Sequence, residues 1–355
     1  AWTPLESPCR NWSGLEDNGR LTRALAVNDE GAVAVGCGFS FPLGVWTTGP
    51  KWIEVEAPSE LSGIFLLPNL IVGADGRVIQ ATRTGVDDSL VVLRTTLGAA
   101  TSTGTMLAKS AIAIDIARMG DQTIVVWQET DPSNDAGTTS RVMAATIGAD
   151  GQCVQQLSQC AHQLSGVGVD ARAPRVAADG VRHWAAAVWE QAFDEIAASV
   201  HRDNFWSFPQ PIVGQAYAST PDVVLDGQGR AHVLFHTSAA GLASSSVIAT
   251  ATRTERDEDW TVTPSLGIYG HHSAPQLAVE EGGTAFAAWS QSATDENVAL
   301  GDVYVARYTT TTHQWQLDAE PRERDSRMPS IAVDASGRAI AVWVHGGALT
   351  VDRYE

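Results

Sequence analysis

Basic residues are scarce in this chain of 355 residues. Lysine and arginine together number 23 against 41 aspartates and glutamates, so the formal net charge is −18, and Lys51 and Lys109 are the only lysines. Binding to a phosphate backbone needs a basic surface that releases counterions, whereas the arginines here are scattered along the chain. The charge balance therefore excludes nucleic acid and acidic lipid headgroups as expected partners.

Long apolar runs are also missing. No stretch approaches the roughly 18 apolar residues of a membrane-spanning helix, so no transmembrane segment is predicted. The opening Ala1-Trp2-Thr3-Pro4 lacks the basic and apolar regions of a signal peptide, and a start without methionine is typical of a processed chain. With 44% hydrophobic and 18% charged residues, the chain can bury a sizeable core instead of remaining disordered.

Cysteine is limited to four residues, and none of them has the C-x-x-C spacing of a metal or redox motif. An even number in a processed chain favours two disulfides. Cys153 and Cys160 enclose a loop short enough for an S–S bond to close, whereas pairing of Cys9 with Cys37 depends on the fold. Four reduced cysteines are the alternative. These features predict a secreted, periplasmic or cell-surface protein.

One sequence motif is repeated along the whole chain. It consists of a proline, a short apolar run, a turn with Gly or Asp-Gly, and a second apolar run that ends in an aromatic residue. The clearest copies are 329–343, 275–289, 221–235 and 174–189. Weaker copies follow residues 23, 68 and 110, so successive steps from 23 to 329 are 45, 42, 64, 47, 54 and 54 residues. This period is typical of propeller blades.

Each copy predicts four strands. Its two apolar runs form a hairpin, and a third run and then usually a tryptophan follow. The last copy ends after its third run, and residues 1–8, which contain Trp2, resemble the missing fourth strand. We therefore predict an all-β, seven-bladed β-propeller that forms one domain over residues 1–355, with the N-terminal strand closing the last blade. An open β-solenoid is the alternative.

The tryptophans that end the second strands recur at fixed places in the repeat. Trp127, Trp189, Trp289 and Trp343 alternate with apolar neighbours, which indicates packing between blades more than stacking on sugars.

Polar residues recur where the innermost strands start and where the second strands end. Both sets of loops open on one face of a propeller, which we call the rim. The ligand-binding candidates at the rim are Lys109, Gln128, Arg172, Glu190, His236, His272, Arg327 and His345. Guanidinium forks at such a rim bind carboxylate or hydroxyl groups, and carboxylates or amides orient them. The plainer interpretation is that these side chains only solvate loop ends.

No cofactor or metal site is predicted. The chain has no H-E-x-x-H, G-x-S-x-G, P-loop or EF-hand pattern. His232 and His236 lie four positions apart in a predicted strand, about 13 Å at the usual rise of a strand, and cannot share one ion.

The repeat, Pro-x-apolar-Ala-x-Asp-x-x-Gly-x-Ala-x-x-x-Trp, resembles those of bacterial extracellular propellers of the sialidase-like and polysaccharide-active groups. It lacks the Asp-box Ser-x-Asp-x-Gly-x-Thr-Trp of sialidases, so their arginine triad and tyrosine nucleophile match no position here. Seven-bladed bacterial lectins are similar in architecture but have more regular sugar-binding repeats. The resemblance implies contact with glycans without assigning a residue.

The function we expect is that of an extracellular binding or interaction module that recognises a glycan or another anionic ligand on one face. A polysaccharide lyase or glycoside hydrolase acting at the same face is one alternative. A structural subunit of a surface assembly, with a surface protein as partner, is another. Catalysis usually needs complementary groups in a pair or triad, and the candidates come from different blades with no recognisable spacing.

Overall fold

The structure is a computed structural model, and it describes most of the chain beyond residue 24. The described ranges are 25–27, 33–36, 43–46, 52–55, 65–72, 77–84, 89–96, 103–132, 139–150, 152–154, 160–192, 195–213, 217–238, 246–257, 259–263, 266, 270–272, 275–280, 282–292, 301–317, 323–333, 337–345 and 348–354. The predicted strand at residues 1–8, Cys9 and Cys37 lie outside them. No helix long and apolar enough to span a membrane occurs in the described ranges.

Every regular element of the described residues is a β-strand, and antiparallel neighbours form six sheets, A to F. Sheet A consists of β1 Leu25–Val27, β2 Val33–Gly36, β3 Leu43–Trp46 and β4 Trp52–Val55. Sheet B consists of β5 Phe65–Val72, β6 Arg77–Thr84, β7 Leu90–Thr96 and β8 Thr103–Ala108. Sheet C consists of β9 Ala111–Met119, β10 Gln122–Thr130, β11 Ser140–Ile147 and β12 Ala161–Gln163.

The remaining sheets have more varied outer strands. Sheet D consists of β13 Ala171–Asp179, β14 Trp184–Gln191, β15 Glu195–Arg202, β16 Phe205–Trp206 and β17 Gln210–Val213. Sheet E consists of β18 Ser219–Leu225, β19 Arg230–Ser238, β20 Ser246–Thr254 and β21 Thr261–Thr263. Sheet F begins with β22 His271–His272, β23 Gln276–Val279, β24 Ala285–Ser292, β25 Gly301–Thr309 and β26 Gln314–Leu317. It continues with β27 Glu323–Val333, β28 Ala339–His345 and β29 Ala348–Tyr354.

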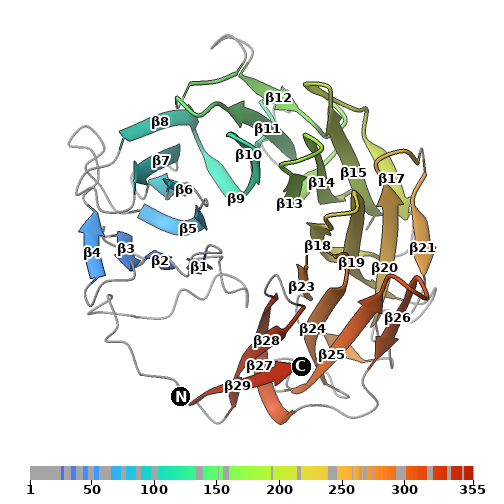
Figure 1. The fold of residues 1–355 in the computed structure, drawn as a ribbon. Coiled ribbons are helices and arrows are strands. Elements are labelled where there is room, and N and C mark those ends of the chain that lie inside the picture. The colour runs from blue at the N-terminus through green and yellow to red at the C-terminus, as the bar shows by residue number, and fades with distance from the viewer. Residues whose placement is uncertain are drawn as a thin grey trace.

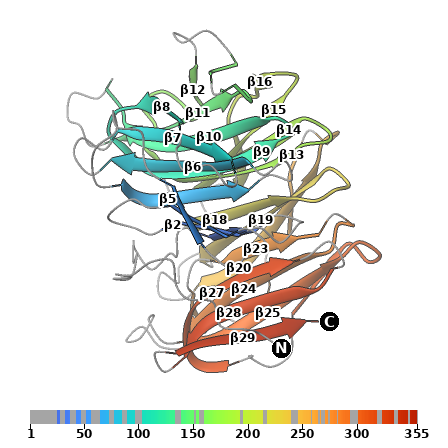
Figure 2. The same cartoon turned by 60° about the vertical axis from the view of Figure 1, so that its left-hand side comes forward.

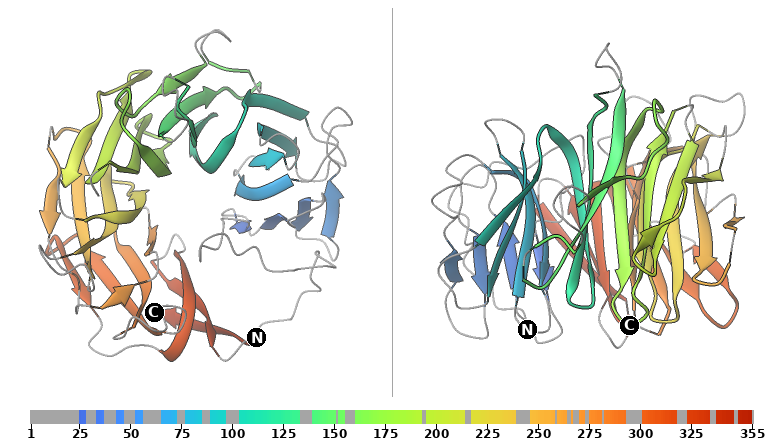
Figure 3. Two further views of the ribbon diagram at one scale, coloured as in Figure 1. Left: turned by 180° about the vertical axis from the view of Figure 1, so that it is seen from behind. Right: turned by 90° about the horizontal axis from the view of Figure 1, so that it is seen from above.

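The sheets stand side by side around a central opening (Figure 1). Strands β5, β9, β13, β18 and β23 lie nearest the opening, and each contacts the next along the chain. β1 contacts β5 and β23 contacts β27, so the ring follows chain order. The strands run between two opposite faces of the ring (Figures 2 and 3). Because the strands are antiparallel, the turns between first and second strands and those between third and fourth strands share the face opposite the rim.

Sheet F contains two copies of the repeat. Its first five strands come from the copy at 275 and its last three from the copy at 329. They are joined because the start of β27 pairs with β25, with Val303 opposite Glu323 and Gly301 opposite Ser326.

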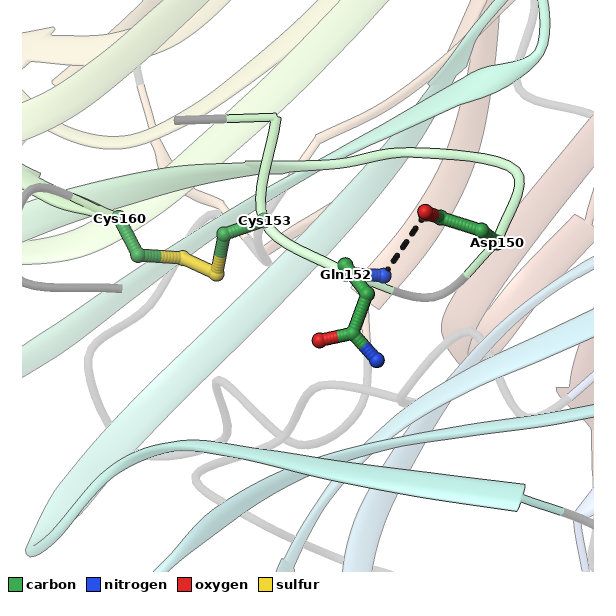
Figure 4. Close-up of a disulfide and its surroundings, with 4 residues drawn as sticks. All are labelled: Asp150, Gln152, Cys153 and Cys160. Carbon is green, nitrogen blue, oxygen red and sulfur yellow. Dashed lines mark hydrogen bonds between the residues drawn. A yellow bond between two sulfur atoms is a disulfide. The ribbon is translucent and has the colours of Figure 1, made fainter. Parts of the chain in front are cut away.

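The outer strand of sheet C is interrupted and then closed covalently. The first piece pairs with β11 through a single antiparallel backbone β-bridge between Cys153 and Ile147. The second piece, β12, pairs with β11 from Ala161 onward. The two pieces are joined by the Cys153–Cys160 disulfide, whose Cα atoms lie 5.5 Å apart (Figure 4). This confirms the first predicted disulfide.

The apolar core lies in layers between neighbouring sheets. One layer joins sheets B and C around Trp127, another joins C and D around Trp189, and a third joins E and F around Trp289. Trp343 packs within sheet F. All four side chains are buried, which confirms the packing interpretation of the repeated tryptophans.

Glycines in the turns between first and second strands allow neighbouring sheets to approach closely. Gly229 has φ +81°, and a Cβ added there would lie 2.9 Å from Cδ of Arg182 in the preceding sheet. Gly283 has φ +96°, and its added Cβ would lie 3.4 Å from the Gln228 side chain of the preceding sheet. Only glycine combines this backbone conformation with such contact, which explains the glycine of the repeat.

Candidate functional site

At the rim, side chains that end the second strands reach the innermost strand of the next sheet. Gln128 accepts a hydrogen bond through Oε1 from the backbone N–H of Ala173, at 3.1 Å. Glu190, the corresponding residue one sheet later, accepts through Oε1 from the N–H of Thr220, at 2.7 Å. Two candidates from the sequence thus hold neighbouring sheets together.

The residues that they bind have an unusual backbone. Ala173 and Thr220 have φ values of +51°, and each precedes a proline, where an extended conformation is normal. The strands are irregular at both places, with register shifts between Arg172 and Arg175 and between Ser219 and Asp222. A left-handed conformation costs about 1–2 kcal/mol at a residue other than glycine, so the hydrogen bonds from Gln128 and Glu190 stabilise a strained bulge.

The structure also brings a third candidate, Arg172, next to Glu190. Arg172 Nε lies 3.3 Å from Glu190 Oε2, and the arginine side chain is 55% exposed while that of Glu190 is 15% exposed. The positive charge of Arg172 therefore already has a counter-charge, and that carboxylate is itself fixed by the Thr220 amide.

The backbone positions of the other candidates are equivalent ones on other sheets. Lys109 is exposed directly before β9, and His236 is buried on β19 opposite Ser219. The backbone places His272 opposite Gln291, Arg327 opposite Val344 and His345 opposite Ser326. These positions share the rim end of their strands with Arg172.

Six of the innermost strands, β5, β9, β13, β18, β23 and β27, share a polar residue that the rim residues predicted from the sequence did not include. Register places these residues at one equivalent position, namely Asn69, Asp115, Arg175, Asp222, Gln276 and Ser330. Asp115 accepts through Oδ2 from the Val176 N–H at 2.9 Å, and Asp222 accepts from the Leu277 N–H at 2.8 Å. The sequence signal was available, because five of the six residues directly follow the proline of the repeat.

Arg175 departs from this pattern. It occupies the position where sheets C and E have carboxylates that bind the next sheet, but a guanidinium has no acceptor to offer an amide. Its side chain is half-buried, and within the described part of the chain it forms neither a side-chain hydrogen bond nor an ion pair. Among the described residues, the innermost strand of sheet D thus has one arginine with a counter-charge, Arg172, and one without, Arg175.

At the opposite face, sheet E contains a buried carboxylate and imidazole. Asp226 Oδ2 lies 3.1 Å from His232 Nε2, and both side chains are fully buried. Asp226 Oδ1 also accepts from the backbone N–H groups of Gln228 and Arg230, at 3.0 and 2.8 Å. His232 Nδ1 has no hydrogen-bond partner among the described residues.

The two pKa values of this pair both fall. Burial lowers the pKa of His232 against the effect of the nearby Asp226 carboxylate. Burial opposes ionisation of Asp226, but the hydrogen bonds from His232 and the two amides outweigh it, so its pKa is lowered. At neutral pH the pair is therefore a carboxylate and a neutral imidazole that donates from Nε2.

The arrangement of these sheets is that of a β-propeller. No protein-family model matches the chain, and no curated protein matches its sequence. Solved structures do match. The Dos1 propeller is 11% identical with a TM-score of 0.58, and the match covers 94% of this chain and 77% of that one.

Two enzyme structures match at the same level. Kuenenia stuttgartiensis hydrazine synthase is 12% identical with a TM-score of 0.56, over 98% of this chain and 99% of the other. The intramolecular trans-sialidase from Ruminococcus gnavus, solved with oseltamivir carboxylate, is 10% identical with a TM-score of 0.50, over 83% and 95%. Identities this low show the fold alone.

Proposed function

We propose that the protein is a seven-bladed β-propeller that binds an anionic, hydroxyl-rich ligand, a glycan in the first instance, without converting it. Seven blades follow if the two repeat copies in sheet F count as separate blades, and residues 1–8 would supply the outer strand beside β29. Contact of the innermost strands from β1 to β27 in chain order supports this count.

Arg175 is the observation that carries the binding proposal. The chain has a net charge of −18, which repels anions in general. An arginine on an innermost strand with no counter-charge among the described residues attracts an anion locally, because the ligand does not have to displace a carboxylate of the protein. A fork of guanidinium donors binds a carboxylate in bidentate fashion. Arg172, three residues away, contributes less because Glu190 already neutralises it.

The Cys153–Cys160 disulfide supports a location outside the reducing cytoplasm. An exported acidic propeller meets acidic and neutral polysaccharides there, and so we propose glycans as the ligand class.

The experiment is a titration of the protein with neutral and uronate-containing oligosaccharides, followed calorimetrically. Binding of the uronates should weaken about tenfold or more in Arg175→Gln, the loss of one charged hydrogen bond. It should change only about twofold in Arg172→Gln, and it should fall as salt is added. Arg256→Gln, which removes an exposed arginine at the opposite face, is the control of equal charge.

Assays of the same oligosaccharides for new reducing ends or unsaturated uronates separate the classes of function. Product formation would show an enzyme and overturn the non-catalytic proposal. Absence of both binding and product across the panel would reject the glycan proposal and favour a protein partner.

A further inference from the structure

A second arginine that forms no ion pair within the described part of the chain lies at the opposite face, between sheets E and F. Arg230, the first residue of β19, donates through Nη1 to the hydroxyl of Tyr308 and to Nδ1 of His313, the latter at 3.0 Å. The Tyr308 hydroxyl lies 3.2 Å from the same Nδ1. The turn between first and second strands of one sheet thus meets the turn between third and fourth strands of the next.

The buried pair beneath fixes both sides of this cluster. Asp226 holds the backbone N–H of Arg230, and its partner His232 packs its ring edge-on against Tyr308 with centroids 4.6 Å apart. Tyr308 is buried, and burial raises its pKa against the opposing effect of the Arg230 charge. The phenol is therefore a neutral, immobile acceptor for the guanidinium.

Arg230 forms no ion pair with a carboxylate of the described residues. Asp257 is the exposed carboxylate that responds to its charge: hydrogen bonds from Thr254, together with the charges of Arg253 and Arg230, lower the pKa of Asp257. The two side-chain partners of Arg230 are a phenol hydroxyl and an imidazole nitrogen, and no carboxylate of the described residues lies within ion-pair distance of its guanidinium. The carboxylate of Asp226 is buried and already accepts three hydrogen bonds. Both contacts use Nη1, so Nη2 and Nε of Arg230 form no hydrogen bond with the described residues and can donate to a ligand as a fork.

His313 adds a donor beside this fork. An arginine can only donate, so Nδ1 of His313 is the acceptor in this contact and Nε2 is the ring nitrogen that carries a proton. His313 is exposed, and its Nε2–H is therefore open to solvent. Threonines 309–312 supply hydroxyl groups in the same turn.

We propose that Arg230, Tyr308 and His313 form a binding site for a carboxylate group, separate from the rim and independent of the function proposed there. The Arg230 fork takes the two carboxylate oxygens, Tyr308 holds the guanidinium in place, and the His313 Nε2–H donates to the same group. A fork that contacts a phenol and an imidazole, with no ion pair among the described residues, keeps more of its charge for a ligand than Arg172, which is paired with Glu190.

Titration with sodium glucuronate, with glucose as the neutral control, tests the site. The titration is done on the full chain, on Arg230→Gln, on Arg175→Gln and on the variant with both substitutions. Glucuronate should bind to the Arg175→Gln protein, and adding Arg230→Gln should weaken that remaining binding about tenfold or more. His313→Ala and Tyr308→Phe should weaken it about threefold to tenfold, and Arg256→Gln should leave it within about twofold.

Each outcome decides one site. The carboxylate site at Arg230 is rejected, and the rim proposal stands, if Arg175→Gln alone abolishes all glucuronate binding. The same conclusion follows if adding Arg230→Gln or Arg256→Gln to the Arg175→Gln protein gives equal affinities for glucuronate. If Arg230→Gln abolishes all binding and Arg175→Gln changes nothing, the rim proposal fails and this site stands. Circular dichroism and thermal melting of Arg230→Gln show whether a lost signal comes from unfolding.

Discussion

Arg172 and Arg230 occupy opposite ends of neighbouring blades and differ in their counter-charge. Arg172 lies 3.3 Å from Glu190, a carboxylate that the Thr220 amide also holds. Arg230 contacts a phenol and an imidazole, while the nearby carboxylate of Asp226 is buried and occupied. An arginine at the surface of a repeat protein is therefore a binding candidate according to what neutralises it, and its position in the repeat does not decide this.

Replacing Asp226 tests the buried carboxylate that holds the backbone of Arg230. Replacing it by alanine removes the acceptor for two backbone amides and leaves the Nε2–H of His232 buried without a partner, so the free energy of unfolding should fall by about 3 kcal/mol. Urea denaturation measures this. Asp121→Ala, which removes an exposed carboxylate from the corresponding turn of sheet C, should stay within about 0.5 kcal/mol. Equal losses in both variants would refute the anchoring role of Asp226.

His201 can be compared with His232, because it is a buried histidine that forms no ion pair with a carboxylate of the described residues. It is 3% exposed and packs against Trp206, and burial, together with the charge of His162, lowers its pKa to about 4. The unfolded state binds its proton more readily, so stability is lost as pH falls from 7 towards 4. Between pH 7 and 5 the loss should be about 2 kcal/mol.

The histidine contribution is the difference between the intact protein and His201→Gln, because carboxylates titrate in both. Urea denaturation at the two pH values measures it. Identical pH dependence in the two proteins would show that His201 does not change its protonation on folding.

Glu190 gives the smallest effect and tests the rim end. Glu190→Ala removes the acceptor for the strained Thr220 amide and should lower the free energy of unfolding by about 1–2 kcal/mol. Glu190→Gln keeps that acceptor, as Gln128 does one sheet earlier, and loses only a partly exposed ion pair, so it should cost under about 1 kcal/mol. Equal losses of stability in the two variants would mean that Glu190 contributes through its ion pair with Arg172 and not through its hydrogen bond with the Thr220 amide.

The sequence predicted the sheets well because the four clearest repeat copies have the same short signals and the three weaker copies keep a similar spacing. Proline, the turn glycine and the final tryptophan each have a local physical reason, and the structure shows Trp127, Trp189, Trp289 and Trp343 buried between or within sheets. The Cys153–Cys160 bond was predictable from loop length alone. The strand proposed for residues 1–8 lies outside the described residues and stays a prediction.

The site was harder to predict because its contacts join residues far apart in the chain. Glu190 and Thr220 are 30 residues apart, and Arg230 and Tyr308 are 78 apart. Nothing in the local sequence shows that Gln128 and Glu190 satisfy backbone amides of the next sheet. Aligning the repeat copies by the residue after proline would have found Arg175, since it is the only cation in a position otherwise filled by Asn, Asp, Gln and Ser.

The most direct test of the account follows the arginine side chains themselves. In a protein with ¹⁵N-labelled arginine, the Nε–Hε signals of Arg172, Arg175 and Arg230 are assigned by substitution and monitored during a glucuronate titration. We expect the Nε–Hε signals of Arg175 and Arg230 to shift until glucuronate saturates the protein. The signal of Arg172 should shift little, because Glu190 already binds its Nε. A shift of Arg172 alone, or of none of the three, would contradict the claim that the missing counter-charge defines the binding sites.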